Sequence, residues 1–290
     1  MLLVRSLGRC EDIATRTILG GYHSVSNQKN ASHFGRAVME GNVSQLQFCR
    51  YQATLGGIVV AFWATSDGET IGPQGRRVDA SLGATTTSEP ERLPSELFDV
   101  QDVGENLRCG NVWEAVPALI MCLGPLLDRL CAVPSDTPPR VLELGAGMGL
   151  PGLWAAARGA EVVLTDSNLA VLELLERNAR FLGEGAPAVR ALDWAALPDW
   201  ITGAEFDLVI ASDVLYDCAA VEPFFGVVAA ALKPGGTLLV SHTDRGIVSF
   251  DEAIQRAQVE FGLSWTAEAS GGEGGGLGES IACHTFEKDF

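Results

Sequence analysis

A glycine-rich stretch at residues 141–152 has the composition of a ligand-binding turn. Its sequence is Val-Leu-Glu-Leu-Gly-Ala-Gly-Met-Gly-Leu-Pro-Gly, in which an apolar run leads directly into glycines at 145, 147 and 149. Glycine permits backbone angles that a β-carbon forbids, and it lets a ligand lie against main-chain amides. Pro151 suits the first turn of a following helix. Because unpaired amides and the helix dipole favour negative charge there, the stretch predicts a site for a ligand that carries a carboxylate or a phosphate.

Polar side chains follow the next apolar runs along the chain. Asp166 closes the run at 161–165, and the pairs Asp193–Trp194 and Ser212–Asp213 close two later runs. Ligands of open α/β sheets bind beyond the carboxyl ends of the strands, so we expect these side chains at one edge of a sheet. Asp166 can accept both hydroxyls of a ribose, Asp193 can accept from an exocyclic amine, and Trp194 can face a purine. The pattern therefore predicts a nucleoside-like ligand whose charged tail lies at the glycine turn.

Two ligand classes fit this outline. The spacing Gly147-x-Gly149-x-x-Gly152 satisfies the fingerprint of dinucleotide-binding proteins, and Asp166 would be an acceptable ribose carboxylate for them. Three features disfavour a dinucleotide: the glycines follow the strand as Glu-x-Gly-x-Gly-x-Gly, the chain ends in two consecutive strands that a dinucleotide fold does not need, and no group of residues suits hydride transfer.

The elements that must position these residues alternate between strand and helix. An amphipathic helix with apolar positions between 116 and 130 comes first, and Pro117 lies in its first turn. We then expect strands at 141–144, 161–165, 188–192, 206–211 and 237–242, and helices at 153–158, 168–182, 219–232 and 250–261, with the helix before the fifth strand ending at Lys233-Pro234-Gly235-Gly236. Two final strands, at 263–268 and 281–287, should pair antiparallel across a glycine-rich connection. The fold class is therefore α/β, a doubly wound, mostly parallel seven-strand sheet of the Rossmann-like type with the final strand antiparallel.

The first 96 residues form an N-terminal extension of unknown role. Residues 46–54 and 58–65 are predicted as a hairpin, and residues 66–96 are rich in Gly, Ser, Thr and Pro, which is typical of a loop or linker. We place the domain boundary between residues 96 and 97, with the α/β domain at 97–290.

The composition narrows the class of partner. A net charge of −17 disfavours nucleic acid, because affinity for a phosphate backbone comes chiefly from clustered Lys and Arg. The longest apolar stretch, 55–64, is too short to cross a bilayer, so no membrane partner is expected. The seven cysteines contain no C-x-x-C pair and predict reduced thiols in an intracellular protein. The four histidines show no metal-ligand spacing, so no metal is predicted.

The location of the protein is expected to be cytoplasmic. Arginines at 5, 9 and 16 are typical of a transit peptide, whereas Glu11 and Asp12 break its acid-poor pattern, so organellar import is the alternative. We expect a monomer.

These residues resemble a known family, the class I (seven-β-strand) S-adenosylmethionine-dependent methyltransferases. More narrowly, they resemble its methyltransferase-like protein-lysine N-methyltransferase branch. The resemblance covers residues 97 to 290 and rests on these motifs: the stretch 141–152, Leu164-Thr165-Asp166, Leu192-Asp193-Trp194, Ala211-Ser212-Asp213-Val214-Leu215-Tyr216, Leu232-Lys233-Pro234-Gly235-Gly236 and Val112-Trp113-Glu114-Ala115. The glycine and Lys-Pro-Gly-Gly motifs are common to many class I enzymes. The upstream tryptophan together with Asp-Trp and Asp-x-x-Tyr is more specific.

The resemblance implies a role for each matching residue. S-adenosyl-L-methionine would be the cofactor. The residues implied to contact it are Gly145, Ala146 and Gly147 at the methionine part, Asp166 at the ribose, Asp193 and Trp194 at the adenine, Ser212 through its backbone, and Trp113 packed beside the cofactor. Asp213 and Tyr216 would line the channel for the amine, so they are the catalytic candidates: Asp213 would orient the ammonium and Tyr216 would support it.

The acceptor follows from the same resemblance. A partner protein that presents a lysine side chain is the first expectation. A protein histidine or a small molecule is the alternative, as is a catalytically silent scaffold. Several residues also have a structural interpretation: Asp166 as a helix cap, Trp113, Trp194 and Tyr216 as packed rings, and Glu143 as a support for the glycine turn.

Overall fold

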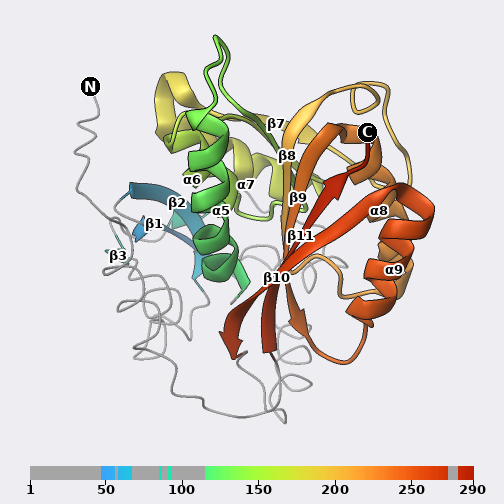
Figure 1. Cartoon of the computed structure of the whole chain (residues 1–290). Helices are drawn as coiled ribbons and strands as arrows, with labels where there is room; N and C mark the ends of the chain where they lie inside the picture. Colours follow the sequence, from blue (N-terminus) through green and yellow to red (C-terminus); the bar gives the residue numbers. More distant parts are fainter. Residues whose placement is uncertain (1–46, 56–57, 67–84, 87–90, 93–114, 274–279) are drawn as a thin grey trace.

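The structure is a computed structural model, and it describes residues 47–55, 58–66, 85–86, 91–92, 115–273 and 280–290. Its centre is a seven-stranded sheet with the strand order β10-β11-β9-β8-β5-β6-β7 (Figure 1). The strands are β5 (Arg140–Leu144), β6 (Glu161–Asp166), β7 (Ala188–Ala191), β8 (Phe206–Ser212), β9 (Leu232–Asp244), β10 (Leu263–Glu273) and β11 (Ser280–Lys288). The predicted doubly wound, mostly parallel sheet is confirmed, because β11 alone runs in the direction opposite to the other six strands.

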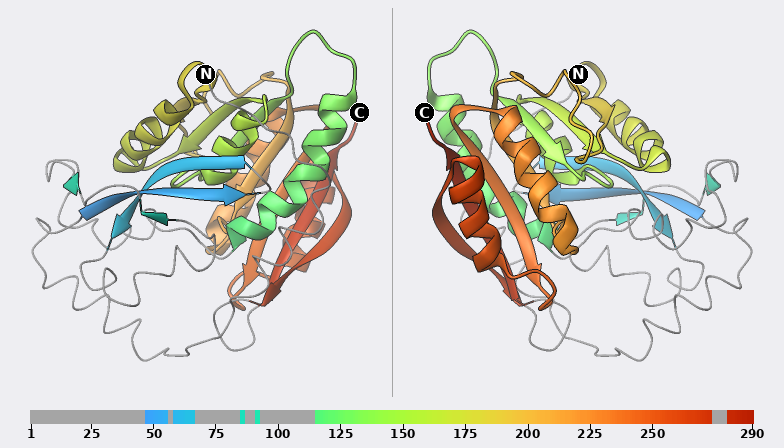
Figure 2. Two further views of the ribbon diagram at one scale, coloured as in Figure 1. Left: turned by 90° about the vertical axis from the view of Figure 1, so that its left-hand side faces the viewer. Right: turned by 90° about the vertical axis from the view of Figure 1, so that its right-hand side faces the viewer.

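Helices cover both faces of the sheet (Figure 2). One face carries α5 (Ala115–Ala132), α6 (Leu150–Ala157) and α7 (Leu169–Ala179), and the other carries α8 (Val221–Ala231) and α9 (Phe250–Phe261). Alternate residues along a strand pack against the helices of opposite faces. Val141 and Leu208 pack with the first group of helices, while Leu142 and Val209 pack with the second. An apolar run such as β8 is thus buried on both sides, as its composition predicted.

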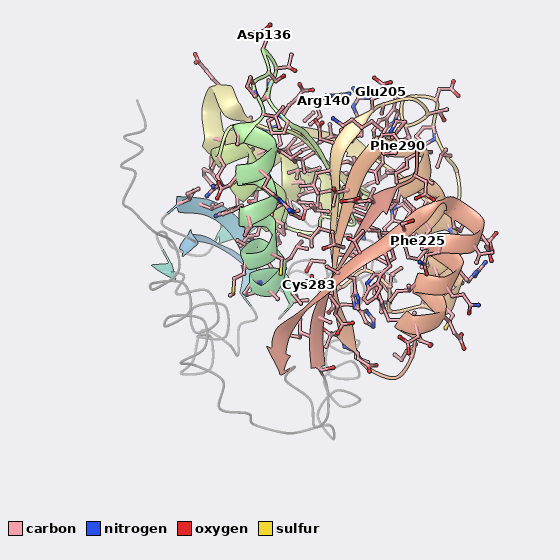
Figure 3. All side chains as sticks on the ribbon, viewed as in Figure 1. Asp136, Arg140, Glu205, Phe225, Cys283 and Phe290 are labelled. Carbon is pink, nitrogen blue, oxygen red and sulfur yellow. The ribbon has the colours of Figure 1, made fainter. Side chains whose placement is uncertain are left out.

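Aromatic rings fill much of the layer beneath α8 and α9. Phe225, labelled in Figure 3, lies with its ring centroid 5.8 Å from that of Phe286 and 6.3 Å from that of Phe261. Phe224 is equally buried and lies edge-on to Trp194, which follows β7. These contacts connect the end of β7 to α8, so the core itself fixes the position of Trp194.

Several boundaries differ from those predicted, three of them near glycine residues. Helix α6 begins at Leu150 rather than at 153, so Pro151 and Gly152 lie in its first turn. The helix predicted at 168–182 ends at Ala179 and continues as a 3-10 helix, Arg180–Gly185, because Gly183 adopts a non-helical conformation. The Lys-Pro-Gly-Gly motif belongs to β9 rather than to a separate turn. Leu232 already pairs with Phe206, and pairing resumes at Thr237 with Leu208, so the four residues between them form a bulge.

The predicted N-terminal hairpin is present. Strand β1 (Gln47–Leu55) pairs antiparallel with β2 (Ile58–Ser66), and two short strands, β3 (Thr85–Thr86) and β4 (Glu91–Arg92), pair with β1. Val60 of β2 is buried in the core cluster that α6 and α7 also form, so the hairpin packs onto the sheet domain.

Helix α5 departs from the expectation that no segment is long and apolar enough to cross a membrane. Among the described residues it alone meets that test by length and composition. Its apolar composition has another explanation within the fold, because Leu119, Leu123 and Leu127 are fully buried in the core shared with α6. An 18-residue helix that packs on one face of a sheet needs such an apolar side.

Candidate functional site

The glycine turn between β5 and α6 has the backbone that its sequence predicted. Gly145, Gly147 and Gly149 all have a positive φ, of 61°, 55° and 76°. The amide of Ala146 donates to the carbonyl of Thr165 at 2.8 Å, which ties the turn to the end of β6. The turn therefore presents its main chain at the carboxyl edge of the sheet, immediately before the N-terminus of α6.

Gly152 is required by close packing. A Cβ added there would lie 2.3 Å from Cδ2 of Leu164 and 2.5 Å from Oε2 of Glu143. Neither position leaves room for a methyl group, so the first turn of α6 can approach β5 and β6 only with glycine at this position.

Glu143 is a buried carboxyl behind the turn. Its Oε2 accepts a hydrogen bond of 2.8 Å from the amide of Gly152, which corresponds to the supporting role expected for it. Burial raises the pKa of Glu143 to about 8; the bond from Gly152 opposes this rise, and the nearby Asp166 adds to it. A group with that pKa holds its proton through much of the neutral range.

Asp166 bridges the glycine turn and the start of α7. Its carboxylate accepts from the amide of Gly147 at 3.1 Å and from the amide of Asn168 at 3.0 Å. The second bond is the structural role that a helix-capping residue would have, and the first places the same carboxylate against the predicted binding turn. Burial raises the pKa of Asp166, and its bonds from backbone amides oppose that rise.

Trp194 and Asp193 lie beyond the end of β7. The side chain of Trp194 is half-buried, and a Cβ added to Gly145 would lie 3.5 Å from its Cζ2. The same added Cβ would lie 2.8 Å from Cγ1 of Val214, which follows β8. Asp193 is exposed and accepts from the amide of Ala195 at 2.9 Å. The structure thus brings three strand ends together around Gly145.

Ser212 and Asp213 close β8. The hydroxyl of Ser212 lies 2.9 Å from that of Ser241 on β9. Asp213 has a φ of 56°, which is rare for a residue with a side chain, and its amide donates to the carbonyl of Ser241 at 2.8 Å. Its side chain is 2% exposed, so the carboxylate is withdrawn from solvent.

Arg245 binds that carboxylate. Its Nη1 and Nη2 donate to Oδ1 and Oδ2 of Asp213 at 2.9 and 2.6 Å, and the amide of Thr243 donates to Oδ1 at 3.1 Å. Arg245 was not predicted, because it lies in a polar loop without hydrophobic periodicity. The ammonium-orienting role of Asp213 stays a prediction, and the structure places its carboxylate within an ion pair.

Tyr216 and Trp113 are the two remaining predicted residues. Tyr216 is 64% exposed, on the segment that follows β8. Trp113 lies outside the described residues.

A buried amide on α7 also supports the turn. Nδ2 of Asn178 donates to the carbonyl of Met148 at 2.9 Å, and the residue is fully buried. Sequence reasoning missed it because an asparagine within a helical pattern gives no sign of its partner.

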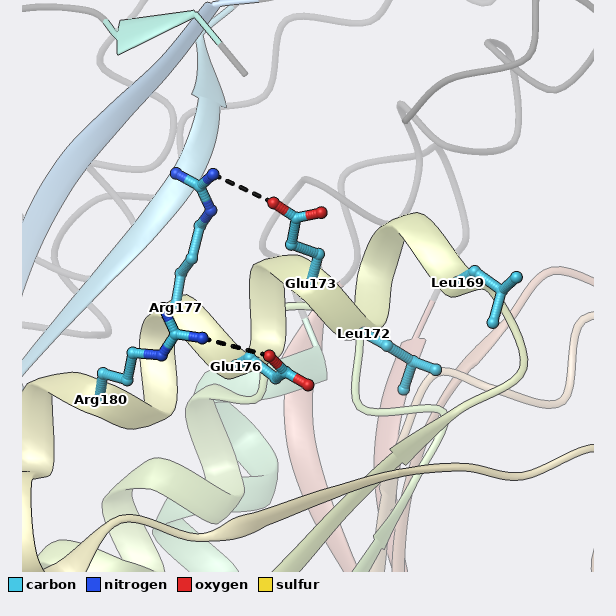
Figure 4. Close-up of a pocket in the computed structure, with 6 residues that line it drawn as sticks. All are labelled: Leu169, Leu172, Glu173, Glu176, Arg177 and Arg180. Carbon is cyan, nitrogen blue, oxygen red and sulfur yellow. Dashed lines mark hydrogen bonds and ion pairs between the residues drawn. The ribbon is translucent and has the colours of Figure 1, made fainter. Parts of the chain in front are cut away.

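A surface pocket elsewhere has a different character. It lies on the outer side of α7 and is lined by Leu169, Leu172, Glu173, Glu176, Arg177 and Arg180 (Figure 4). Its charges are paired along the helix, with Arg177 bound to Glu173 at 3.0 Å and Arg180 to Glu176 at 3.3 Å. The charged side chains of this pocket are thus paired with one another.

Known proteins share this sequence pattern. Residues 93–261, more than half of the chain, match the family model described as lysine methyltransferase. The mouse EEF1A lysine methyltransferase 3 is 31% identical over 153 residues, 50% of this chain and 61% of that protein. The protein N-lysine methyltransferase METTL21A of Xenopus tropicalis is 35% identical over 113 residues, 36% of this chain and 46% of that protein. The matching part of the chain thus spans about half to three fifths of these relatives.

A solved structure has the same fold. The protein from Galdieria sulphuraria, named as a candidate sarcosine dimethylglycine methyltransferase, aligns with a TM-score of 0.50 at 14% identity, over 66% of this chain and 88% of that one. At this identity the likeness concerns the fold alone. The sequence match and the glycine turn of the seven-stranded sheet agree, and the chain belongs to the lysine methyltransferase family, whose members are S-adenosylmethionine-dependent.

Proposed function

We propose that this chain transfers a methyl group from S-adenosylmethionine to a lysine side chain of a partner protein. The observation that carries the proposal is the convergence of Gly145, Trp194 and Val214 at one edge of the sheet, in a chain of the lysine methyltransferase family. A fold of this kind serves many acceptors. The choice of lysine is supported by the names of the two relatives.

The residues at the edge of the sheet fit the cofactor. Positive φ angles at Gly145 and Gly147 turn the main chain just before the N-terminus of α6, and glycine there lets a ligand approach the backbone closely, which suits the carboxylate of the methionine part. The half-buried carboxylate of Asp166 suits the ribose hydroxyls, and Asp193 with the ring of Trp194 suits the adenine. When bound, S-adenosylmethionine supplies a methyl group made electrophilic by its sulfonium.

The protein then has two tasks toward the acceptor. It must hold the nitrogen in line with the methyl group, and positioning of this kind supplies up to about 7–11 kcal/mol in ideal model systems. It must also favour the neutral amine, because an ammonium has no lone pair to donate. Desolvation near Val214 and Asp213 favours the neutral form.

The charge of the chain supports a partner that is basic around the target lysine. With a net charge of −17, the chain attracts cationic proteins over distances comparable with the Debye length.

The experiment is methylation of a cell lysate by the purified chain with isotope-labelled S-adenosylmethionine. Labelled proteins are digested, and mass spectrometry locates the methyl group on lysine. Calorimetric titration with S-adenosylhomocysteine is run in parallel. We expect binding, together with a gain of about 14 Da on lysine of a small set of proteins.

Other outcomes would each redirect the proposal. Label on histidine or in the small-molecule fraction would overturn the lysine assignment, and binding without any transfer would indicate a silent scaffold. The matched control is Glu173→Gln, which removes a half-buried carboxylate of α7 away from the glycine turn and should leave both binding and transfer unchanged.

A further inference from the structure

Asp213, which forms an ion pair with Arg245, directly precedes Val214 in the chain. Val214 reaches the space in front of Gly145, so its neighbour Asp213 borders the same site. The carboxylate is almost completely buried, while the Arg245 side chain is 27% exposed. The guanidinium of Arg245 therefore shields the carboxylate from solvent.

The pair is held from several directions. Nη1 of Arg245 donates to Oδ1 of Asp213 and Nη2 donates to Oδ2, a bidentate geometry that fixes orientation as well as distance. The amide of Thr243 adds a third bond, and the left-handed backbone of Asp213 turns the side chain toward β9. A residue held in a rare backbone conformation near a site indicates that its orientation matters there.

Charge balance is the consequence of this geometry. Among the described residues, the ionisable groups around this pair include the buried His242, whose pKa is lowered chiefly by burial, and the exposed Asp244. The buried His284 neighbours His242, and its pKa is also lowered chiefly by burial. With His242 neutral, the bidentate pair has no net charge. An acceptor amine that enters beside Val214 thus meets a compensated pair and not an isolated anion.

We propose that Arg245 is a positioning residue for methyl transfer, whose guanidinium compensates Asp213 so that the acceptor lysine enters as its neutral amine. An isolated carboxylate at this place would favour the ammonium form of lysine, which has no lone pair, and would so slow methyl transfer. This inference rests on the proposed function, and it adds the group that sets the ionisation of the acceptor.

The test is the pH dependence of kcat with a lysine peptide derived from a methylated protein. For the wild type, we expect the rate to rise with pH and level off below about pH 9, since kcat reports the ionisation of the bound complex and free lysine has a pKa of about 10.4. The rising part of the pH profile of kcat, called the limb below, has an apparent pKa. If that pKa in the wild type lies at or above the pKa of free lysine, the inference is overturned without any variant.

Three variants separate charge from structure. Arg245→Met exposes the Asp213 anion and should move the limb up by about one pH unit, with kcat at pH 7 reduced about 10-fold and recovering at high pH. Arg245→Lys keeps the charge and should keep the limb near that of the wild type. Asp213→Asn combined with Arg245→Met restores neutrality and should return the limb toward the wild type.

A purely structural role predicts a different result. Loss of packing alone would lower kcat equally at all pH values, would leave the limb in place, and would not be repaired in the double variant. That result would overturn the inference. The matched control is Arg256→Met, which removes a guanidinium from two exposed carboxylates on the α8–α9 side and should not move the limb.

Failure of the inference is distinguishable from failure of the proposed function. A wild-type chain that binds S-adenosylhomocysteine but methylates no lysine contradicts the proposed function. A chain that methylates lysine with an unshifted limb in Arg245→Met contradicts the inference alone. Thermal unfolding of each variant confirms that the compared proteins are folded.

Discussion

The carboxyl group of Glu143 on β5 accepts a hydrogen bond of 2.8 Å from the backbone amide of Gly152 in α6. Both residues belong to the glycine-rich stretch, and the bond connects β5, before the turn, to the first turn of α6, after it. Glu143 is 2% exposed, so an acidic side chain is buried at the base of the binding turn. The arrangement makes the stability of the turn depend on the protonation of one group.

Glu143→Gln should therefore change the stability of the protein in a pH-dependent way. Burial raises the pKa of Glu143 to about 8, above its ordinary 4.5, so the folded state binds this proton more tightly than the unfolded state. The resulting stability is complete below pH 4.5 and is lost as the pH rises through 8. Glutamine keeps an acceptor for the Gly152 amide without the acid. The melting temperature of the variant should gain several degrees on the wild type between pH 5 and pH 9.

Differential scanning fluorimetry at pH 5, 7 and 9 measures this difference. Glu143→Ala is the companion variant, because it removes the acceptor as well and should be destabilised at every pH. A gap between Glu143→Gln and the wild type that stays constant with pH would contradict the prediction.

Gly152→Ala should destabilise the fold by about 1–3 kcal/mol, because the added methyl group has no room beside Leu164 and Glu143. Chemical denaturation measures the loss. Gly185→Ala is the matched control: it is exposed, no heavy atom lies within 4 Å of its added Cβ, and its effect should stay within about 0.5 kcal/mol. Equal effects at the two positions would show that packing is not the cause.

Asp166→Asn should weaken binding of S-adenosylhomocysteine by about 10- to 100-fold, the loss of about 1.5–3 kcal/mol expected for a hydrogen bond to a charged group. The amide oxygen of asparagine can still accept from Gly147, so the turn itself should survive. Isothermal titration calorimetry measures the affinity. Unchanged binding would assign Asp166 to the start of α7 alone.

His284 should make the protein less stable in mild acid. Its pKa is lowered to about 4 by burial first and by the neighbouring His242 second, and the half-exposed Glu268 at 3.6 Å does not offset this. A histidine whose pKa is lowered contributes stability that is present above its ordinary 6.5 and lost as the pH falls toward 4. Its ring stacks on that of Phe250 at 3.9 Å between centroids.

The variant His284→Gln removes this titration. Its melting temperature, relative to that of the wild type, should therefore rise as the pH is lowered from 7 to 4.5. A parallel decline of the two proteins over that range would show that other groups cause the acid sensitivity.

The elements were predictable where hydrophobic pattern and turn residues agree. The apolar run of β8 and the glycine turn follow from composition alone, because burial on both faces and positive φ angles each demand particular residue types. Arg245 and Asn178 were not predictable, since their partners are Asp213 and Met148, which are distant in the sequence. A polar residue shows its role only when folding brings its partner near.

Strand β11 lies between β9 and β10 although it follows both of them in the sequence. Until residues 280–288 have left the ribosome, β9 has no neighbour on that side and β10 has no sheet to join. An uncovered strand edge is a template for association with other chains. Biosynthesis of this domain therefore passes through a stage at which the strands from β5 to β10 exist but β9 has an open edge, and chaperones that shield such edges are expected to matter most before β11 is made.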